Sequence, residues 1–364
     1  MFQFLHGADF HLDSPFSALP PELAAQRRRE SRAMLGRMAD YVNARGIRLV
    51  LLAGDLLDSG SVYRDTAEQL ASELGRMEAL VCIAPGNHDF YTPGGLWDTV
   101  AWPENVHIFR AGQMEAVEIP ALGAVVHGAA FTGPEQADSL LAGLSAPADG
   151  RVHLGVLHGE VEPSRRRYDP ISRQDIAQSG LAYLALGHVH KGMEPQRCGA
   201  TLWAWPGCPE GRGFDETGEK GVLCGTVSDD GAVEASFVPF ARRRYEIVEA
   251  DVTGRTALEA AEQAIHGDTR RDLYRIILTG EADGTVDAGA VESALRERFY
   301  ALEVRDETRM AADVWAGAGE ESLRGLFLRT LRQKWDSAPD EETRRRIALA
   351  ARFGLAALEH RDLG

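Results

Sequence analysis

The clearest pattern along the chain is a series of short, unbroken apolar runs, each ending in a chemically reactive residue. Residues 49–53 are apolar and lie between Arg48 and Gly54, and Asp55 follows at once. Such a run predicts a strand buried on both faces, as in sheets covered by helices. Because ligands bind at the carboxyl ends of strands in open α/β sheets, Asp55 lies at a candidate binding edge.

Helical patterns alternate with these runs in the first part of the chain. Apolar residues at helical spacing predict a helix over 22–45, which ends at Gly46, and another over 63–77. With strands at 2–5, 49–53 and 80–84, this alternation favours parallel βαβ units. Later strands are predicted at 106–109, 114–119, 123–127, 152–157, 181–186, 201–205, 220–227 and 232–240, with helices at 135–144 and 172–179.

The pattern changes after residue 241 and divides the chain into three parts. Residues 1–241 form the predicted α/β domain, and residues 245–310 predict a small α+β domain. Residues 320–364 predict two amphipathic helices separated by Pro339. The apolar stripes of these helices either pack on this chain's own domains or bind a partner.

Composition narrows the class of protein. The chain has 364 residues, 44% of them apolar, and no run approaches about 18 consecutive apolar residues, so we predict no membrane span. No signal peptide is evident, and the four cysteines form no C-x-x-C pair, which predicts a cytoplasmic protein with reduced thiols. Because the net charge is −16, any contact with nucleic acid must come from local basic clusters. The alternative is that these clusters are ordinary solvated surface. They are Arg27–Arg29 with Arg32, Arg165–Arg167, Arg242–Arg244 and Arg344–Arg346.

The residues at the predicted strand ends form a chemically coherent set. Imidazoles, carboxylates and one amide oxygen, with no thiolate, suit Mn²⁺, Fe²⁺ or Zn²⁺ better than Ca²⁺. Eight residues make up this set: Asp9, His11, Asp55, Asn87, His88, His158, His188 and His190. Seven of them suffice to bind two ions if one carboxylate is shared. The remaining histidines are expected in the core or in turns: His6, His107, His127, His153, His266 and His360.

Five motifs in this order resemble those of the calcineurin-like metallophosphoesterases. They are Asp9-Phe10-His11, Gly54-Asp55 with Asp58, Gly86-Asn87-His88-Asp89, His158-Gly159 and Gly187-His188-Val189-His190. Residues 4–16 and 205–214 are similar to the SbcD-type DNA-repair exonucleases, in particular their YhaO-like branch. The resemblance covers roughly residues 1–240 and implies a four-layer αββα sandwich, followed by a capping domain and a helical C-terminus.

The resemblance also implies a role for each motif residue. One metal ion would be held by Asp9, His11, Asp55 and His190, and the second by Asp55, Asn87, His158 and His188, with Mn²⁺ favoured over Fe²⁺ and Zn²⁺. His88 would stabilise the transition state or protonate the leaving oxygen. Asp89 would orient His88 through a hydrogen bond, or would serve only as a loop cap.

These roles imply a metal-dependent DNA phosphodiesterase, an exonuclease or endonuclease of a DNA-repair complex. Its partners would be DNA and a coiled-coil ATPase of the SbcC type, docked on residues 320–364, and the sequence leaves homodimerisation open. Candidate DNA contacts are Arg165, Arg166, Arg167 and Arg212. The alternatives are a phosphatase or cyclic-nucleotide phosphodiesterase for small substrates, because fold does not set the substrate, and a non-catalytic metal-binding scaffold.

Overall fold

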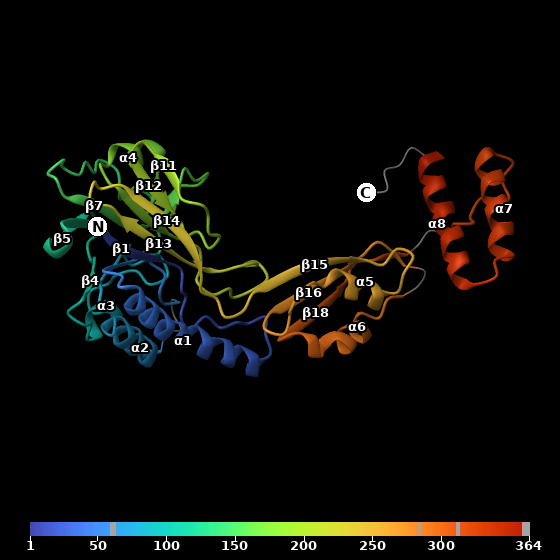
Figure 1. Cartoon of the computed structure of the whole chain (residues 1–364), viewed down its shortest axis with the longest axis horizontal. Helices are drawn as coiled ribbons and strands as arrows, with labels where there is room; N and C mark the ends of the chain where they lie inside the picture. The colour runs from blue at the N-terminus through green and yellow to red at the C-terminus, as the bar shows by residue number, and fades with distance from the viewer. Residues whose placement is uncertain (59–62, 283–284, 311–313, 359–364) are drawn as a thin grey trace. The chain divides into compact units, whose positions relative to one another are not determined.

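The computed structural model of the chain describes residues 1–58, 63–282, 285–310 and 314–358. The chain divides into two compact units, Met1–Arg244 and Tyr245–Gly364 (Figure 1). This division lies a few residues after the boundary predicted at 241. Among the described residues, no helix combines the length and the apolar character needed to cross a bilayer.

The first sheet of unit 1 has six strands in the order β14-β13-β1-β2-β3-β4. Strands β1 to β4 are parallel, whereas β13 and β14 pair antiparallel at one side. The strands are β1 (Phe2–Gly7), β2 (Leu49–Leu52), β3 (Leu80–Ile83), β4 (Val106–Ile108), β13 (Gly221–Val227) and β14 (Val233–Pro239). The helices in this half are α1 (Pro21–Arg45), α2 (Arg64–Gly75) and α3 (Leu96–Thr99).

The second sheet also has six strands, in the order β11-β12-β10-β7-β6-β5. Its central strands β12, β10, β7 and β6 are parallel. The elements are β5 (Glu115–Ile119), η1 (Pro120–Leu122), β6 (Ala124–Gly128), β7 (Val152–His158), α4 (Arg173–Gln178), β10 (Tyr183–Gly187), β11 (Gln196–Cys198) and β12 (Thr201–Ala204). A short ribbon, β8 (Glu160–Val161) with β9 (Pro170–Ile171), follows β7.

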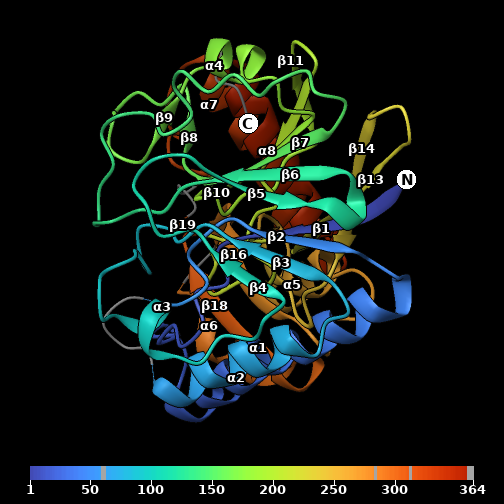
Figure 2. The ribbon, with the colours of Figure 1, turned by 90° about the vertical axis from the view of Figure 1, so that its left-hand side faces the viewer.

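The two sheets pack face to face. Successive side chains of β2 point to opposite faces of the first sheet, and both faces are buried, which explains why its apolar run is continuous. Leu49 and Leu51 lie in the core between the sheets with Phe4 and Val156. Val50 and Leu52 point to the other side and pack with residues of α1 and α2. Figure 2 shows α1 and α2 on the outer face of the first sheet and α4 on that of the second. Unit 1 is therefore an α/β sandwich, as predicted.

The helix predicted over 135–144 is absent, and this prediction was wrong. The backbone N–H of Gln136 donates to the carbonyl of Arg167, and the N–H of Asp169 donates to the carbonyl of Gln136, both at 2.8 Å. These bonds to a distant segment replace the local bonds of a helix. Leu141 is nevertheless buried against the outer face of the second sheet, so turns complete this layer together with α4.

Unit 2 begins with three parallel strands in the order β15-β16-β18. Its elements are β15 (Tyr245–Asp251), α5 (Ala257–Ala264), β16 (Leu273–Thr279), α6 (Ala288–Leu295), η2 (Arg296–Arg298) and β18 (Ala301–Asp306), with a small ribbon of β17 (Glu281–Ala282) and β19 (Arg309–Met310). Because helices connect parallel strands, this part is α/β and not the α+β domain that the sequence predicted.

The last part of unit 2 is a pair of helices, α7 (Leu323–Asp336) and α8 (Glu341–Leu358), as the amphipathic stripes predicted. Ser322 caps α7 by accepting a hydrogen bond from the N–H of Gly325. Leu328 and Ala351 are buried, whereas Leu323 and Phe353 remain largely exposed. Residues 359–364 of the predicted C-terminal segment lie outside the described residues.

Candidate metal centre

Three strands of the first sheet and two of the second end at one site. They deliver Asp9 and His11 after β1, Asp55 after β2, Asn87 after β3, His158 at the end of β7, and His188 and His190 after β10. The backbone N–H of His188 donates to the Asp9 carboxylate at 2.9 Å, which links the two sheets directly. The structure therefore brings all seven predicted ligands together at the carboxyl ends of parallel strands, where open α/β sheets bind ligands.

The backbone at this site is held in an unusual conformation. Asp9, His11, Asp55 and His188 all have positive φ, between 42° and 92°. Residues other than glycine rarely adopt this region, and such strain concentrates at functional sites. Gly54, just before Asp55, has φ +82°, and an added Cβ would lie 2.6 Å from Nδ1 of His158. Glycine there lets the β2 loop and β7 approach each other closely.

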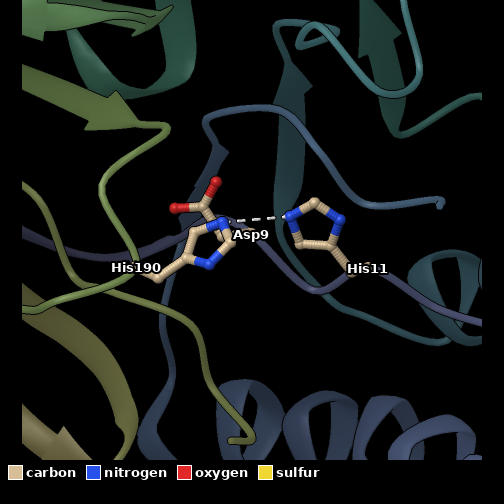
Figure 3. A group of neighbouring side chains, drawn as sticks. All are labelled: Asp9, His11 and His190. Carbon is tan, nitrogen blue, oxygen red and sulfur yellow. Dashed lines mark hydrogen bonds between the residues drawn. The ribbon is translucent and has the colours of Figure 1, made fainter. Parts of the chain in front are cut away.

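The first cluster consists of Asp9, His11 and His190, drawn in Figure 3. One ligand atom from each lies within 4.8 Å of the others. The Nε2 atoms of His11 and His190 are 3.2 Å apart, the contact marked by the dashed line. Asp9 and His11 are buried. Three ligand atoms converging in this way can hold a cation.

The second cluster consists of Asp55, His158 and His188, joined by Asn87. The side-chain oxygen of Asn87 lies 2.9 Å from Nε2 of His158 and 3.1 Å from Nδ1 of His188. Oδ2 of Asp55 lies 3.3 Å from Nε2 of His158 and 3.6 Å from Nε2 of His11. One oxygen of Asp55 therefore stands between the two clusters.

The histidine side chains fit metal ligation, because the nitrogen that points away from each cluster meets an oxygen. A ligating imidazole must carry its proton on the other nitrogen, and an acceptor there fixes that tautomer. Three imidazoles make this contact: His190 Nδ1 with Glu216 at 2.7 Å, His158 Nδ1 with the Ala53 carbonyl at 2.9 Å and His188 Nε2 with Glu160 at 3.1 Å. Nδ1 of His11 lies 3.5 Å from Oδ1 of Asp58, without a hydrogen bond.

Burial and neighbouring charges shift the pKa values of several residues in the site. Burial opposes a charge on His158, but Asp55 outweighs it and raises the pKa of His158 to about 9. Burial, together with the charge on His158, lowers the pKa of His188 to about 3. Burial also opposes ionisation of Asp55, yet the neighbouring imidazoles hold the pKa of its carboxyl well below the usual range. The carboxylate that faces both clusters is thus anionic.

His88 lies at the rim of the site and pairs with Asp58. Its Nδ1 is 3.2 Å from Oδ1 of Asp58, and its side chain is 41% exposed. This hydrogen bond raises the pKa of His88 and favours its protonated form. The same oxygen of Asp58 faces Nδ1 of His11, so one carboxylate connects the first cluster with the rim.

Asp89 does not orient His88, and the prediction that it does so was wrong. Oδ1 of Asp89 accepts from the backbone N–H groups of Gly86 at 2.7 Å and Asp55 at 3.2 Å. Its Oδ2 accepts from those of Leu56 at 2.7 Å and Leu57 at 3.2 Å. These four donors occupy the buried carboxylate completely, so Asp89 caps the loops that carry Asp55 and Asn87.

The predicted DNA-contacting arginines fall into two groups. Arg165, Arg166 and Arg167 are exposed on the segment between β8 and β9. The guanidinium of Arg167 pairs with Glu135 and lies 5.3 Å from the ring centre of Tyr168. That ring lies 4.6 Å from the ring of His188, so this segment borders the second cluster.

Arg212 belongs instead to the immediate surroundings of the first cluster. Its Nη2 donates to Oε1 of Glu216 at 2.7 Å and lies 2.9 Å from Nδ1 of His190.

The sequence analysis did not single out Glu216 or Glu160. Glu160 follows His158 by two residues, and Glu216 follows the stretch 205–214, but neither position reveals which way the side chain points.

Three of the other histidines, His6, His127 and His153, are buried in the core, as predicted. His266 is exposed between α5 and β16, whereas His107 is exposed within β4, so the prediction of a core or turn position was wrong for His107. His6 is fully buried between the sheets, with Nδ1 2.9 Å from the Tyr183 hydroxyl and Nε2 3.1 Å from the Leu186 carbonyl. Its burial lowers its pKa to about 3. His127 and His153 are buried and contact each other at 2.9 Å, away from the clusters. His360 lies outside the described residues.

Comparison with known proteins agrees with this arrangement. Residues 2–192, slightly more than half of the chain, match the calcineurin-like phosphoesterase family. The protein therefore belongs to the calcineurin-like phosphoesterases and is a metal-dependent phosphoester hydrolase. It is 30% identical over 343 residues to the uncharacterized metallophosphoesterase YhaO of Bacillus subtilis (strain 168), a match that covers 85% of this chain and 83% of the relative.

Proposed function

We propose that this protein is a DNA phosphodiesterase that works with two divalent cations, Mn²⁺ foremost. The observation that carries the proposal is the position of Asp55, whose Oδ2 stands between His11 and His158. One anionic ligand placed between two cations offsets their mutual repulsion. Asp9, His11 and His190 would complete one site, and Asn87, His158 and His188 the other.

The remaining chemistry falls to residues of the chain itself. A pair of divalent cations, when bound, neutralises the phosphodiester charge and acidifies the attacking water. His88, half exposed at the rim, uses Nδ1 to contact Asp58, which leaves Nε2 for the substrate. Because the Asp58 hydrogen bond raises its pKa, His88 holds a proton that it can donate to the leaving oxygen.

DNA as the substrate is supported by the segment between β8 and β9. Arg165 and Arg166 are exposed there, and Tyr168 of the same segment packs against His188. Arginines beside the reacting phosphate suit a polyanion. The resemblance of residues 205–214 to SbcD-type exonucleases points in the same direction.

A small phosphoester is the second candidate substrate, and the net charge favours it. A chain with a charge of −16 repels DNA except at local basic clusters. In that case the same metal centre would act as a phosphatase or cyclic-nucleotide phosphodiesterase. An inert scaffold is disfavoured by His88, since simple metal binding needs no protonated imidazole at the rim.

The test compares Mn²⁺-dependent cleavage of linear duplex DNA, a single-stranded oligonucleotide and a small chromogenic diester. The wild type should cleave all three, and Asp55→Asn should cleave none, because both sites lose the anionic ligand. Hydrolysis of the small diester without DNA cleavage would favour the second candidate. Asp138→Asn, at a surface position outside the site, serves as the matched control for the loss of one carboxylate.

We further propose that residues 245–310 cap the catalytic unit and that α7 and α8 bind a coiled-coil ATPase of the SbcC type. Leu323, Leu326 and Phe353 are 70%, 56% and 55% exposed on these helices. Exposed apolar side chains on paired helices suit docking to another helix. Leu323→Glu with Leu326→Glu should abolish co-elution with such an ATPase and leave hydrolysis of the small diester unchanged.

A further inference from the structure

Glu216 is a buried carboxylate that contacts one predicted ligand from outside the cluster. Its Oε1 lies 2.7 Å from Nδ1 of His190, and its side chain is only 4% exposed. The same oxygen accepts from Nη2 of Arg212 at 2.7 Å, and Oε2 accepts from the backbone N–H of Arg212 at 2.8 Å. Glu216 is thus held by several donors, all in fixed positions.

Two proton arrangements compete at His190. Nη2 of Arg212 lies 2.9 Å from Nδ1 and can donate to it only if that nitrogen carries no proton. The proton then sits on Nε2, the nitrogen 3.2 Å from Nε2 of His11, and Nε2 cannot bind a cation. With the proton on Nδ1, the ring donates to Glu216 and Nε2 is free. Because an ionised carboxylate only accepts hydrogen bonds, Glu216 selects this second arrangement.

We infer that Glu216 is a positioning residue for the first cation, which holds His190 in the tautomer and orientation that present Nε2 to the site. The backbone N–H of Arg212 holds Oε2 of Glu216 at 2.8 Å, a bond that does not depend on the Arg212 side chain. This inference rests on the proposed two-metal function and extends it to residues outside the five motifs. Outer partners of ligating histidines contribute about 10- to 100-fold to metal affinity.

The test measures Mn²⁺ binding to the full-length, chelator-treated protein by isothermal titration calorimetry. The wild type should bind two ions, and Glu216→Ala should weaken one of them by about 10- to 100-fold while the other is unchanged. Glu216→Gln keeps one acceptor oxygen and should fall between. Arg212→Ala, the matched control, removes the neighbouring side chain but leaves the acceptor of His190, so the affinity should change only a few-fold.

Measuring the effect of Glu216→Ala in the His190→Ala variant separates positioning of His190 from a general structural effect. In His190→Ala protein the first site is already damaged, so Glu216→Ala should have no further effect if it acts through His190. A loss that persists in this background, an equal loss in Arg212→Ala, or unchanged affinity in Glu216→Ala would each overturn the inference. Should Glu216→Ala not fold, wild-type affinity in Glu216→Gln would overturn it.

The failure of this inference is distinct from the failure of the proposed function. A wild type that binds no Mn²⁺ would overturn both. Two bound ions whose affinities are insensitive to Glu216 would overturn the positioning role alone. Glu160→Gln offers a comparison at the second cluster, where Glu160 contacts Nε2 of His188 at 3.1 Å but is 30% exposed. Its effect should fall on the other ion and be smaller.

Discussion

The cap formed by Asp89 makes a quantitative prediction for Asp89→Asn. The two carboxylate oxygens accept from four backbone N–H groups, two each. An asparagine keeps one oxygen and turns an NH₂ group against the other two donors. Each buried donor left without an acceptor costs about 1–3 kcal/mol, so Asp89→Asn should lower the free energy of unfolding of unit 1 by about 2–6 kcal/mol.

The assay is urea unfolding in excess chelator, followed by tryptophan fluorescence. Trp97 reports on this loop directly, because its ring N–H donates to the carbonyl of Asp89. Burial, reinforced by Asp55, raises the pKa of Asp89 to about 6, so the measurement belongs well above that pH, where the carboxylate is charged. Asp58→Asn is the matched control, since that carboxylate contacts the rings of His11 and His88. Equal stability of Asp89→Asn and the wild type would show that the four N–H groups do not depend on the Asp89 carboxylate.

Three further predictions concern the chemistry of the site. His88→Ala, and to a lesser degree Asp58→Asn, should lower kcat by about 10²- to 10⁴-fold with little change in KM, and an unchanged kcat would remove His88 from the reaction. Metal-free protein should lose stability between pH 6.5 and about 9. The raised pKa of His158 stabilises the fold below pH 6.5, and this contribution disappears as His158 deprotonates. Thermal melts of His158→Gln should lack this loss, and a loss shared by both proteins would contradict the role of His158. Replacing Arg165, Arg166 and Arg167 with Gln should raise the KM for DNA and flatten its salt dependence, whereas the same change at Arg344, Arg345 and Arg346 should not; equal effects at both clusters would argue against a local contact.

The strands and most ligand positions were predictable because they depend on local pattern. An apolar run that ends in Asp55 or His158 predicts both a buried strand and a polar residue at its carboxyl end. The helix predicted over 135–144 failed because the backbone of Gln136 pairs with residues 167–169, a partner that no local pattern reveals.

The hydrogen-bond partners of the predicted ligands could not be predicted from the sequence, for a related reason. Asp89 is next to His88 in the chain, yet the imidazole pairs with Asp58, thirty residues away. Glu216 reaches His190 from a turn in which its N–H donates to the Gly213 carbonyl at 3.0 Å. Motif spacing identifies which residues converge, but side-chain direction depends on loops whose course is set by tertiary contacts.

In the proposed function one carboxylate, Asp55, serves two cations at once. The most direct measurement is anomalous diffraction from crystals of the protein grown with Mn²⁺, collected for the wild type and for Asp55→Asn. We expect two peaks in the wild type, one beside His11 and His190 and the other beside His158 and His188, and weakened or missing peaks in the variant. A single peak, or peaks away from Asp55, would contradict this role of Asp55.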